Sequence, residues 1–257
     1  MARVTIRVLG SGDAFGSGGR LQTCFLVSGN PDQALIDCGA TSLVAMRRCG
    51  VDPTVIDTVI LSHLHGDHFG GIPFLLLEAQ FVSQRKRPLV IAGPPGTAKR
   101  LSEALEVLFP GSSKTEWRFP LDIAELKAGR ADRFGGMTVL PLAVEHPAGA
   151  PAFALRLTCH DKVVAYSGDT AWTEALPEVS RGADLFIVEC YAYQPKPKFH
   201  LDFQTLSARR SDLGAKRLLL THMSQDMLDH ADQLDIETAR DGMLIELPCL
   251  VPQAAEA

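Results

Sequence analysis

The chain has 257 residues, 46% of them hydrophobic, and a formal net charge of −5 at pH 7. This composition can bury a large core, and no polar or low-complexity linker divides the sequence, so we expect one domain over residues 1–257. The acidic balance disfavours a nucleic-acid partner, and no apolar run approaches the ~20 residues of a membrane span. The chain lacks a signal-like start, and its cysteines occur singly, which favours buried reduced thiols in a cytoplasmic protein.

Strand-like apolar runs and helical patterns alternate along the chain. We expect strands at residues 3–9, 21–28, 33–37, 55–61, 88–92, 137–144, 152–158, 162–167, 184–189, 216–221 and 243–247. We expect helices from Thr41 or Ser42 to Arg48, from Pro73 to Gln84, from Thr97 to Leu108, and over residues 202–213. This mixture is typical of an α/β domain.

Three histidines and an aspartate lie within six positions, directly after the apolar run 59–61. They are His63, His65, Asp67 and His68. Neutral imidazoles suit zinc, and one loop at the end of a strand can present its side chains to two neighbouring ions. A single histidine is usually a core or surface imidazole, but the chain has only eight, so chance explains this cluster poorly. The motif predicts a divalent-metal site.

Three further candidate ligands each follow an apolar run. His146 follows residues 137–144, Asp169 follows 163–166, and His222 follows 218–220. A strand that opens into a loop can direct side chains to one rim of a sheet. We therefore expect these loops to meet the histidine motif there.

The spacing His-x-His-x-Asp-His, with the later residues in order, resembles the metallo-β-lactamase superfamily. The resemblance implies a four-layer αβ/βα sandwich and a metal-dependent hydrolase with two Zn²⁺ ions, with Mn²⁺ or Fe²⁺ as alternatives. It implies that His63, His65 and His146 hold one ion, that Asp67, His68 and His222 hold the other, and that Asp169 bridges them. Iron-based reduction of oxygen or nitric oxide is disfavoured, because those relatives have a glutamate where this chain has His65.

Two N-terminal segments are similar to those of tRNA 3′-processing endonucleases and related phosphodiesterases. One is the glycine-rich loop 10–20, for which a simple turn is an equally good interpretation. The other is Leu-Ile-Asp-Cys-Gly at 35–39. We expect Asp37 to orient a metal-binding histidine or support the His63 loop rather than bind an ion.

His200 separates the possible chemistries. In the phosphodiesterase branch a histidine at this place is thought to protonate the leaving oxygen, whereas lactonases generally lack it; a solvent-facing helix residue is the alternative. Glu189 takes the place of an acidic residue that can orient and charge this imidazole. The resemblance thus implies attack by a metal-activated hydroxide positioned by Asp67, with His200 as the acid. Ser224 either contacts phosphate or caps a helix.

The length of one interval bears on substrate size. Bacterial tRNA endonucleases carry a long arm between the third histidine and the bridging aspartate, but only 22 residues separate His146 from Asp169 here. A predicted β-hairpin of two strands accounts for all 22 residues. The segments 200–205 and 218–224 resemble compact cyclic-phosphodiester hydrolases of phosphonate breakdown, although only Cys24 stands where those relatives have a cysteine-rich zinc site.

The leading interpretation is a dinuclear zinc phosphodiesterase acting on small or cyclic nucleotide-like diesters. One alternative is a tRNA 3′ endonuclease that functions without the arm, within a homodimer. A second is a lactonase-like hydrolase of C–O or C–N bonds. A third is a non-catalytic binding protein, which the complete ligand set disfavours.

Overall fold

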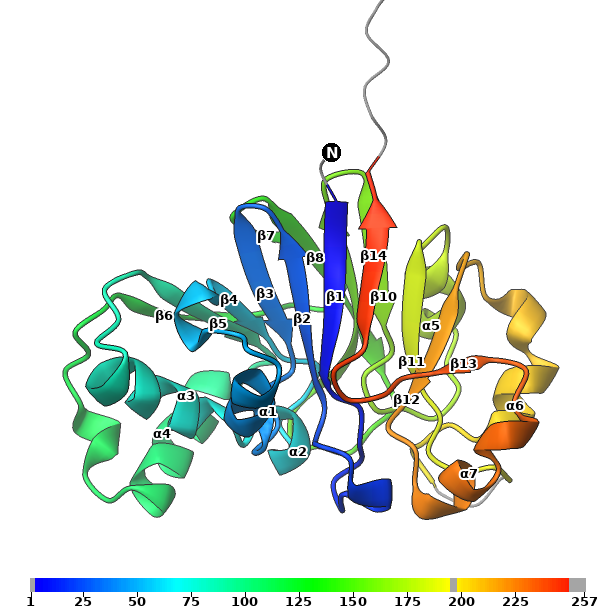
Figure 1. Ribbon diagram of the computed structural model, residues 1–257, viewed down its shortest axis with the longest axis horizontal. Coiled ribbons are helices and arrows are strands. Elements are labelled where there is room, and N and C mark those ends of the chain that lie inside the picture. The colour runs from blue at the N-terminus through cyan, green and yellow to red at the C-terminus, as the bar shows by residue number, and fades with distance from the viewer. Residues whose placement is uncertain (1–2, 195–197, 250–257) are drawn as a thin grey trace, which may run out of the picture.

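Two seven-stranded sheets lie face to face in the computed structural model, with helices on both outer faces (Figure 1). The structure describes residues 3–194 and 198–249. The first sheet has the order β14 (Leu244–Pro248), β1 (Arg3–Gly10), β2 (Cys24–Gly29), β3 (Asp32–Ile36), β4 (Thr58–Ile60), β5 (Leu89–Gly93) and β6 (Leu121–Glu125). The second has the order β13 (Glu237–Thr238), β12 (Leu218–Thr221), β11 (Leu185–Glu189), β10 (Lys162–Tyr166), β9 (Ala152–Cys159), β8 (Met137–Val144) and β7 (Asp132–Phe134).

The helices divide between the two outer faces. The first group is α1 (Ser42–Arg48), α2 (Gly66–Phe69), α3 (Ile72–Leu77) and α4 (Thr97–Leu108); the second is α5 (Ala175–Ser180), α6 (Phe203–Ala208) and α7 (Gln225–Asp229). Separate apolar clusters pack under each group. A third cluster fills the space between the sheets, where the rings of Phe25 and Tyr166 lie 5.5 Å apart. The predicted four-layer αβ/βα sandwich is confirmed.

Strand direction brings the candidate ligands to one edge of the sandwich. β10, β11 and β12 are parallel, and β8 runs in the same direction as β10 because both pair antiparallel with β9. Their carboxyl ends therefore meet at one edge. β4, which precedes the histidine motif, is parallel to β3 and β5, and α2 lies at the lower edge of the view in Figure 1.

Several predicted boundaries need correction. The strand expected at 55–61 is confined to Thr58–Ile60, because Asp52 accepts a hydrogen bond from Thr54 N and caps a 3₁₀ turn at Pro53–Val55. The helix expected over 202–213 ends at Ala208 and gives way to a 3₁₀ turn. The six cysteines are free thiols, but Cys49 and Cys249 are only partly buried.

The expected helix from Pro73 is also divided. α3 ends at Leu77, and the chain continues as a π-helical turn, Glu78–Val82. Within the described ranges, no helix has the length and apolar character needed to cross a bilayer. A single domain over residues 1–257 stays a prediction, since residues 1–2, 195–197 and 250–257 lie outside the described part.

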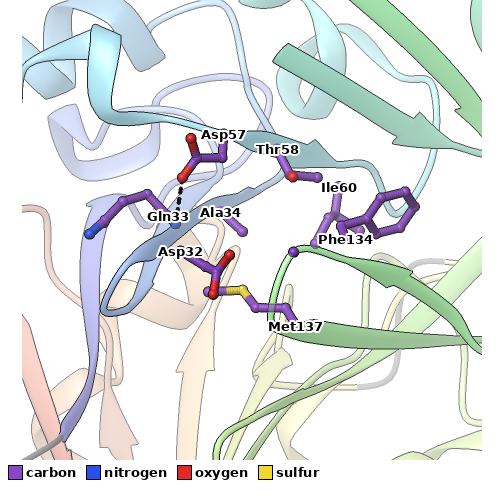
Figure 2. Close-up of a pocket in the computed structure, with 9 residues that line it drawn as sticks. Asp32, Gln33, Ala34, Asp57, Thr58, Ile60, Phe134 and Met137 are labelled. Carbon is purple, nitrogen blue, oxygen red and sulfur yellow. Dashed lines mark hydrogen bonds between the residues drawn. The ribbon is translucent and has the colours of Figure 1, made fainter. Parts of the chain in front are cut away.

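A small cavity lies where the two sheets approach, well away from the histidine motif. Figure 2 shows Asp32 beside Met137 and Phe134 beside Ile60, with Asp57 hydrogen-bonded to Gln33. Its volume of about 30 Å³ suits one water molecule. Gly135, with φ of +57°, passes so close that a Cβ atom would lie 2.1 Å from Asp32 Oδ1. The absence of a side chain at Gly135 allows the β7–β8 turn to pack against β3.

Candidate metal centre

Asp37 fixes the loop that carries the histidine motif. It follows β3 with a left-handed backbone (φ +57°) and is fully buried. One carboxylate oxygen accepts a hydrogen bond from Ser62 N at 2.7 Å, and the other accepts one from Ser62 Oγ at 2.8 Å. It also contacts His68 Nδ1 at 2.7 Å. Asp37 thus supports the loop and orients a histidine, the two roles expected from the sequence.

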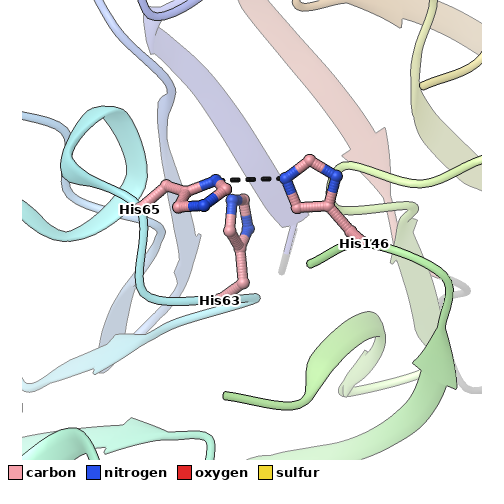
Figure 3. Close-up of side chains that lie close together, drawn as sticks. All are labelled: His63, His65 and His146. Carbon is pink, nitrogen blue, oxygen red and sulfur yellow. Dashed lines mark hydrogen bonds between the residues drawn. The ribbon is translucent and has the colours of Figure 1, made fainter. Parts of the chain in front are cut away.

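His63, His65 and His146 form one group, drawn in Figure 3. Each offers one nitrogen, and these atoms lie within 4.8 Å of one another. His65 Nδ1 is 3.1 Å from His146 Nε2. The chain brings His146 to the motif from the end of β8, more than 75 residues away in sequence.

Asp67, His68, Asp169 and His222 form the second group, again with ligand atoms within 4.8 Å. Asp169 Oδ2 lies 3.3 Å from His68 Nε2 and 3.2 Å from His222 Nε2. The same oxygen is 3.9 Å from a nitrogen of His63 and of His146 in the first group. This single carboxylate oxygen therefore lies between the two groups.

Hydrogen bonds hold four of the five histidine rings by the nitrogen that points away from the centre. His63 Nδ1 contacts Ser62 Oγ at 3.0 Å, and His68 Nδ1 contacts Asp37. The remaining two contacts are His146 Nδ1 with Phe199 O at 3.0 Å and His222 Nδ1 with Thr23 Oγ1 at 3.3 Å. Such contacts fix the ring orientation and leave Nε2 free for an ion.

Burial controls the charge of these rings. It lowers the pKa of His63, His146 and His222, which keeps those imidazoles neutral, as metal binding requires. Burial also lowers the pKa of His68, but the carboxylates of Asp169, Asp67 and Asp37 outweigh it and raise the pKa well above its usual value. A proton and a metal ion therefore compete for His68 Nε2.

The donor set fits divalent ions. His63 Nε2, His68 Nε2 and Asp169 Oδ1 are buried without a hydrogen-bond partner in the described chain. Unpaired buried polar atoms are costly, and bound ions are one recognised reason for them. Imidazole nitrogens with carboxylate oxygens are the ligands that zinc takes in proteins. The cluster could therefore hold a metal.

His200 lies at the open side of the cluster, beside Glu189. His200 Nδ1 is 3.1 Å from Glu189 Oε2, and its side chain is 21% exposed, whereas Glu189 is fully buried. Burial raises the pKa of Glu189 to about 8. Burial lowers the pKa of His200, but the hydrogen bond with Glu189 and the charges of Glu189 and Asp169 together outweigh burial and raise the pKa to about 9. The raised pKa values favour a shared proton on this pair at neutral pH, and the contact with Glu189 uses Nδ1 of His200.

Sequence reasoning missed some residues around the centre. Tyr191 stacks on His200, with ring centroids 4.9 Å apart. Asp241 accepts hydrogen bonds from Ser11 N at 2.9 Å and from Leu21 N at 2.7 Å, and thereby holds the glycine-rich loop. The position of Tyr191 two residues after Glu189 could have indicated it, but no local pattern marks Asp241.

Ser224 has a visible structural role. Its Oγ accepts a hydrogen bond from Met227 N at 3.5 Å at the start of α7. The helix-capping alternative is therefore present, and a phosphate contact stays a prediction.

Residues 4–242 match the family described as "Anti-Pycsar protein Apyc1". The chain belongs to this family. The protein Rv1339 of Mycobacterium tuberculosis, described as uncharacterized, is 31% identical over 226 residues, which cover 86% of this chain and 81% of the relative. A protein named Ribonuclease Z from Methanosarcina acetivorans is 26% identical and aligns with 96% of this chain and 99% of its own length.

The fold comparison agrees. The metallo-beta-lactamase fold protein YhfI from Bacillus subtilis superposes with a TM-score of 0.77 at 24% identity, covering 96% of this chain and all of the other. The predicted metallo-β-lactamase fold is thereby confirmed. A relative that aligns with nearly the whole chain is named Ribonuclease Z, and the chain holds a buried histidine and aspartate cluster that could bind metal. The chain is therefore a metal-dependent hydrolase.

Proposed function

We propose that the protein is a dinuclear zinc phosphodiesterase that hydrolyses small or cyclic nucleotide-like phosphodiesters. The observation that carries this proposal is the pair of Glu189 and His200 at the open side of the cluster. Phosphodiester cleavage expels an alkoxide, which needs a proton donor, and the contact of His200 with Glu189 supports that role for His200. The proposed ligands of one ion are His63, His65 and His146; those of the other are Asp67, His68 and His222; Asp169 is the proposed bridge.

The residues have two roles in the proposed reaction: some act on the attacking water, and others act on the leaving oxygen. Bound divalent ions would lower the pKa of water toward neutrality and polarise a phosphoryl oxygen. Burial raises the pKa of Asp67, but the charge of His68 and the hydrogen bond with it lower this pKa more strongly and keep the carboxylate ionised. The ionised carboxylate of Asp67 would accept a hydrogen bond from the attacking water. Glu189 holds His200 by Nδ1, so Nε2 is the atom that donates the proton to the leaving oxygen.

A small substrate is favoured over tRNA. β9 and β10 form a hairpin between His146 and Asp169, with a short turn at 160–161 and no protruding arm in this fully described interval. The alignment with the Methanosarcina Ribonuclease Z extends over 309 positions, more than the 257 residues of this chain, so that relative carries segments that this chain lacks. Those ribonucleases nevertheless make a tRNA 3′ endonuclease the second candidate.

The test combines leaving groups of different basicity with His200→Ala. On cyclic nucleotides, whose ribose hydroxyl is a poor leaving group, kcat should fall about 10²- to 10⁴-fold. On bis-p-nitrophenyl phosphate the loss should be much smaller, because p-nitrophenolate departs without a proton. Glu189→Gln should show a weaker form of this pattern. Elemental analysis should find metal retained in both variants.

His160→Ala is the matched control. This histidine lies in the β9–β10 turn, where Nε2 contacts Gly29 O at 2.9 Å, away from the cluster. A uniform loss across leaving groups in His200→Ala would assign that residue to substrate positioning instead. Efficient single cleavage of pre-tRNA would favour the ribonuclease, and lactone hydrolysis without any diesterase activity would favour the lactonase-like alternative.

A further inference from the structure

A tyrosine hydroxyl is buried between the two sheets, close to the candidate metal centre. Tyr166 ends β10, three residues before Asp169, and its side chain is fully buried. Its ring packs on Phe25 of β2, with ring centroids 5.5 Å apart. Its oxygen makes no hydrogen bond of good geometry to any residue in the described ranges. A buried hydroxyl without a partner destabilises a fold, so its retention indicates a role.

The backbone around Tyr166 lies against the loop that carries the histidine motif. Phe153 N of β9 donates a hydrogen bond to Ser62 O at 3.0 Å, which joins the second sheet to this loop. Gly168, with φ of +59°, passes so close that a Cβ atom would lie 2.6 Å from Phe153 O and 3.2 Å from Ser62 Cβ. The end of β10 is therefore held next to Ser62, the residue that Asp37 binds.

Three carboxylates act on the hydroxyl of Tyr166. Burial raises its pKa well above the usual value, and the charges of Asp37, Asp169 and Glu189 raise the pKa further. Asp37 has the largest effect of the three, and it is close enough to act on the hydroxyl by direct contact as well. The phenol keeps its proton at neutral pH, so it meets these carboxylates as a hydrogen-bond donor.

Asp37 has an acceptor position left for such a donor. An ionised carboxylate offers about four lone-pair positions on its two oxygens. Ser62 N occupies one position on Oδ1, whereas Ser62 Oγ and His68 Nδ1 both contact Oδ2. One position on Oδ1 therefore remains. Tyr166 offers one hydroxyl hydrogen that no other acceptor in the described chain takes.

We propose that Tyr166 is a positioning residue for the metal centre, which donates its hydroxyl hydrogen to Asp37 and so fixes the carboxylate that orients His68. The inference rests on the proposed set of metal ligands. Tyr166 acts through Asp37 and contacts neither ion nor substrate. A carboxylate held by this further donor stays aligned with His68 Nδ1, which directs Nε2 of that ring at the ion.

Tyr166→Phe removes the hydroxyl and keeps the ring that packs on Phe25. Metal affinity, measured by competitive titration with a chromogenic chelator, should fall about 10- to 100-fold. The urea midpoint of the chelator-treated protein should stay the same or rise, because loss of a buried hydroxyl without a well-formed hydrogen bond has little unfavourable effect on stability. A lower urea midpoint with unaltered metal affinity would show a purely structural role and overturn the inference.

A double-mutant cycle tests the route through Asp37. Adding Tyr166→Phe to Asp37→Asn should lower metal affinity by less than about twofold beyond Asp37→Asn alone, because the two residues act as one unit. Losses that multiply would overturn this route. Tyr193→Phe is the matched control, since that phenol stacks on Phe203 and His230, neither of which is a proposed ligand. It should leave metal affinity unchanged.

The inference and the proposed function can fail separately. If phosphodiesters are hydrolysed and Tyr166→Phe binds metal as tightly as the wild type, the inference is refuted and the proposed function survives. If no phosphodiester is hydrolysed while Tyr166→Phe weakens metal binding and the cycle shows coupling to Asp37, the proposed function fails and the inference survives.

Discussion

Asp37 connects the candidate metal centre to the first sheet through one side chain. Its carboxylate accepts hydrogen bonds from Ser62 and contacts His68, so one residue positions both the loop and a proposed ligand. Asparagine keeps one oxygen and tolerates the left-handed backbone at this position. Its single oxygen cannot replace both carboxylate oxygens, one of which accepts from Ser62 N while the other faces Ser62 Oγ and His68 Nδ1.

Asp37→Asn should therefore weaken metal affinity about 10- to 100-fold while the protein stays folded. Competitive titration with a chromogenic chelator measures this, and circular dichroism checks the fold. Asp57→Asn is the control, because Asp57 bonds Gln33 N and Arg87 rather than a ligand. An unaltered affinity in Asp37→Asn would show that the ring of His68 needs no anchor.

The residues that touch the cluster differ in how visible they are in the sequence. The histidine motif is local, and the superfamily resemblance pointed to His146, Asp169 and His222, each of which follows an apolar run. Thr23, Phe199 and Tyr191 act through a hydroxyl, a backbone carbonyl and a stacked ring. Tertiary packing alone brings such groups to the centre, and no spacing in the chain encodes them.

At the level of elements, long amphipathic or apolar segments were predictable and short ones were not. α4 was predicted with its observed bounds, since twelve residues show a full helical periodicity. β7 has three residues, β13 has two and α2 has four, too few to display a period. β6 was missed because its burial is intermediate along most of its length. These elements depend on their neighbours rather than on local pattern.

Asp184 links three strands of the second sheet. Its carboxylate accepts a hydrogen bond from Val163 N at 2.9 Å and one from Lys216 Nζ at 2.8 Å. Burial raises the pKa of Asp184, but the hydrogen bonds from Lys216 and Val163 and the nearby lysine charges together outweigh burial and leave the pKa below its usual value. A lowered carboxyl pKa stabilises the folded state above the unfolded value and loses that effect as pH falls through the folded value.

Asp184→Asn should thus reduce the free energy of unfolding by about 1 kcal/mol at pH 7, and the difference from wild type should shrink below about pH 4. Urea denaturation at several pH values measures it. Asp122→Asn, an exposed change on β6, should alter stability little at any pH. A difference in the free energy of unfolding that persists below about pH 4 would show that the substitution acts through packing rather than through charge.

For the whole molecule, the metal centre joins the two halves of the sandwich. His63, His65, Asp67 and His68 follow the first sheet, whereas His146, Asp169 and His222 follow strands of the second. Ions bound there would tie the halves together, and binding only to the folded state adds to its stability.

Removing the metal with a chelator should lower Tm by about 10 °C, since loading at 1,000 times Kd contributes about 4 kcal/mol and each kcal/mol shifts Tm by roughly 2–4 °C at this size. Scanning calorimetry with and without chelator measures the shift. Asp169→Ala should melt at the same temperature under both conditions. If the wild type has the same Tm with and without chelator, metal binding does not contribute to the stability of the fold.

The order of the proposed ligands and of β14 along the chain determines when the candidate metal centre can form during protein synthesis. β14 comes after every proposed ligand in the chain, yet it pairs with β1 and completes the first sheet. A nascent chain that has emerged as far as His68 holds four donors but lacks the partners that each ion needs. His222 supplies the last donor, and β14 then closes the sheet on which the earliest donors stand. A ribosome-bound chain would therefore complete the candidate site only after His222 has emerged, so the earlier part of the growing chain cannot form the full donor set.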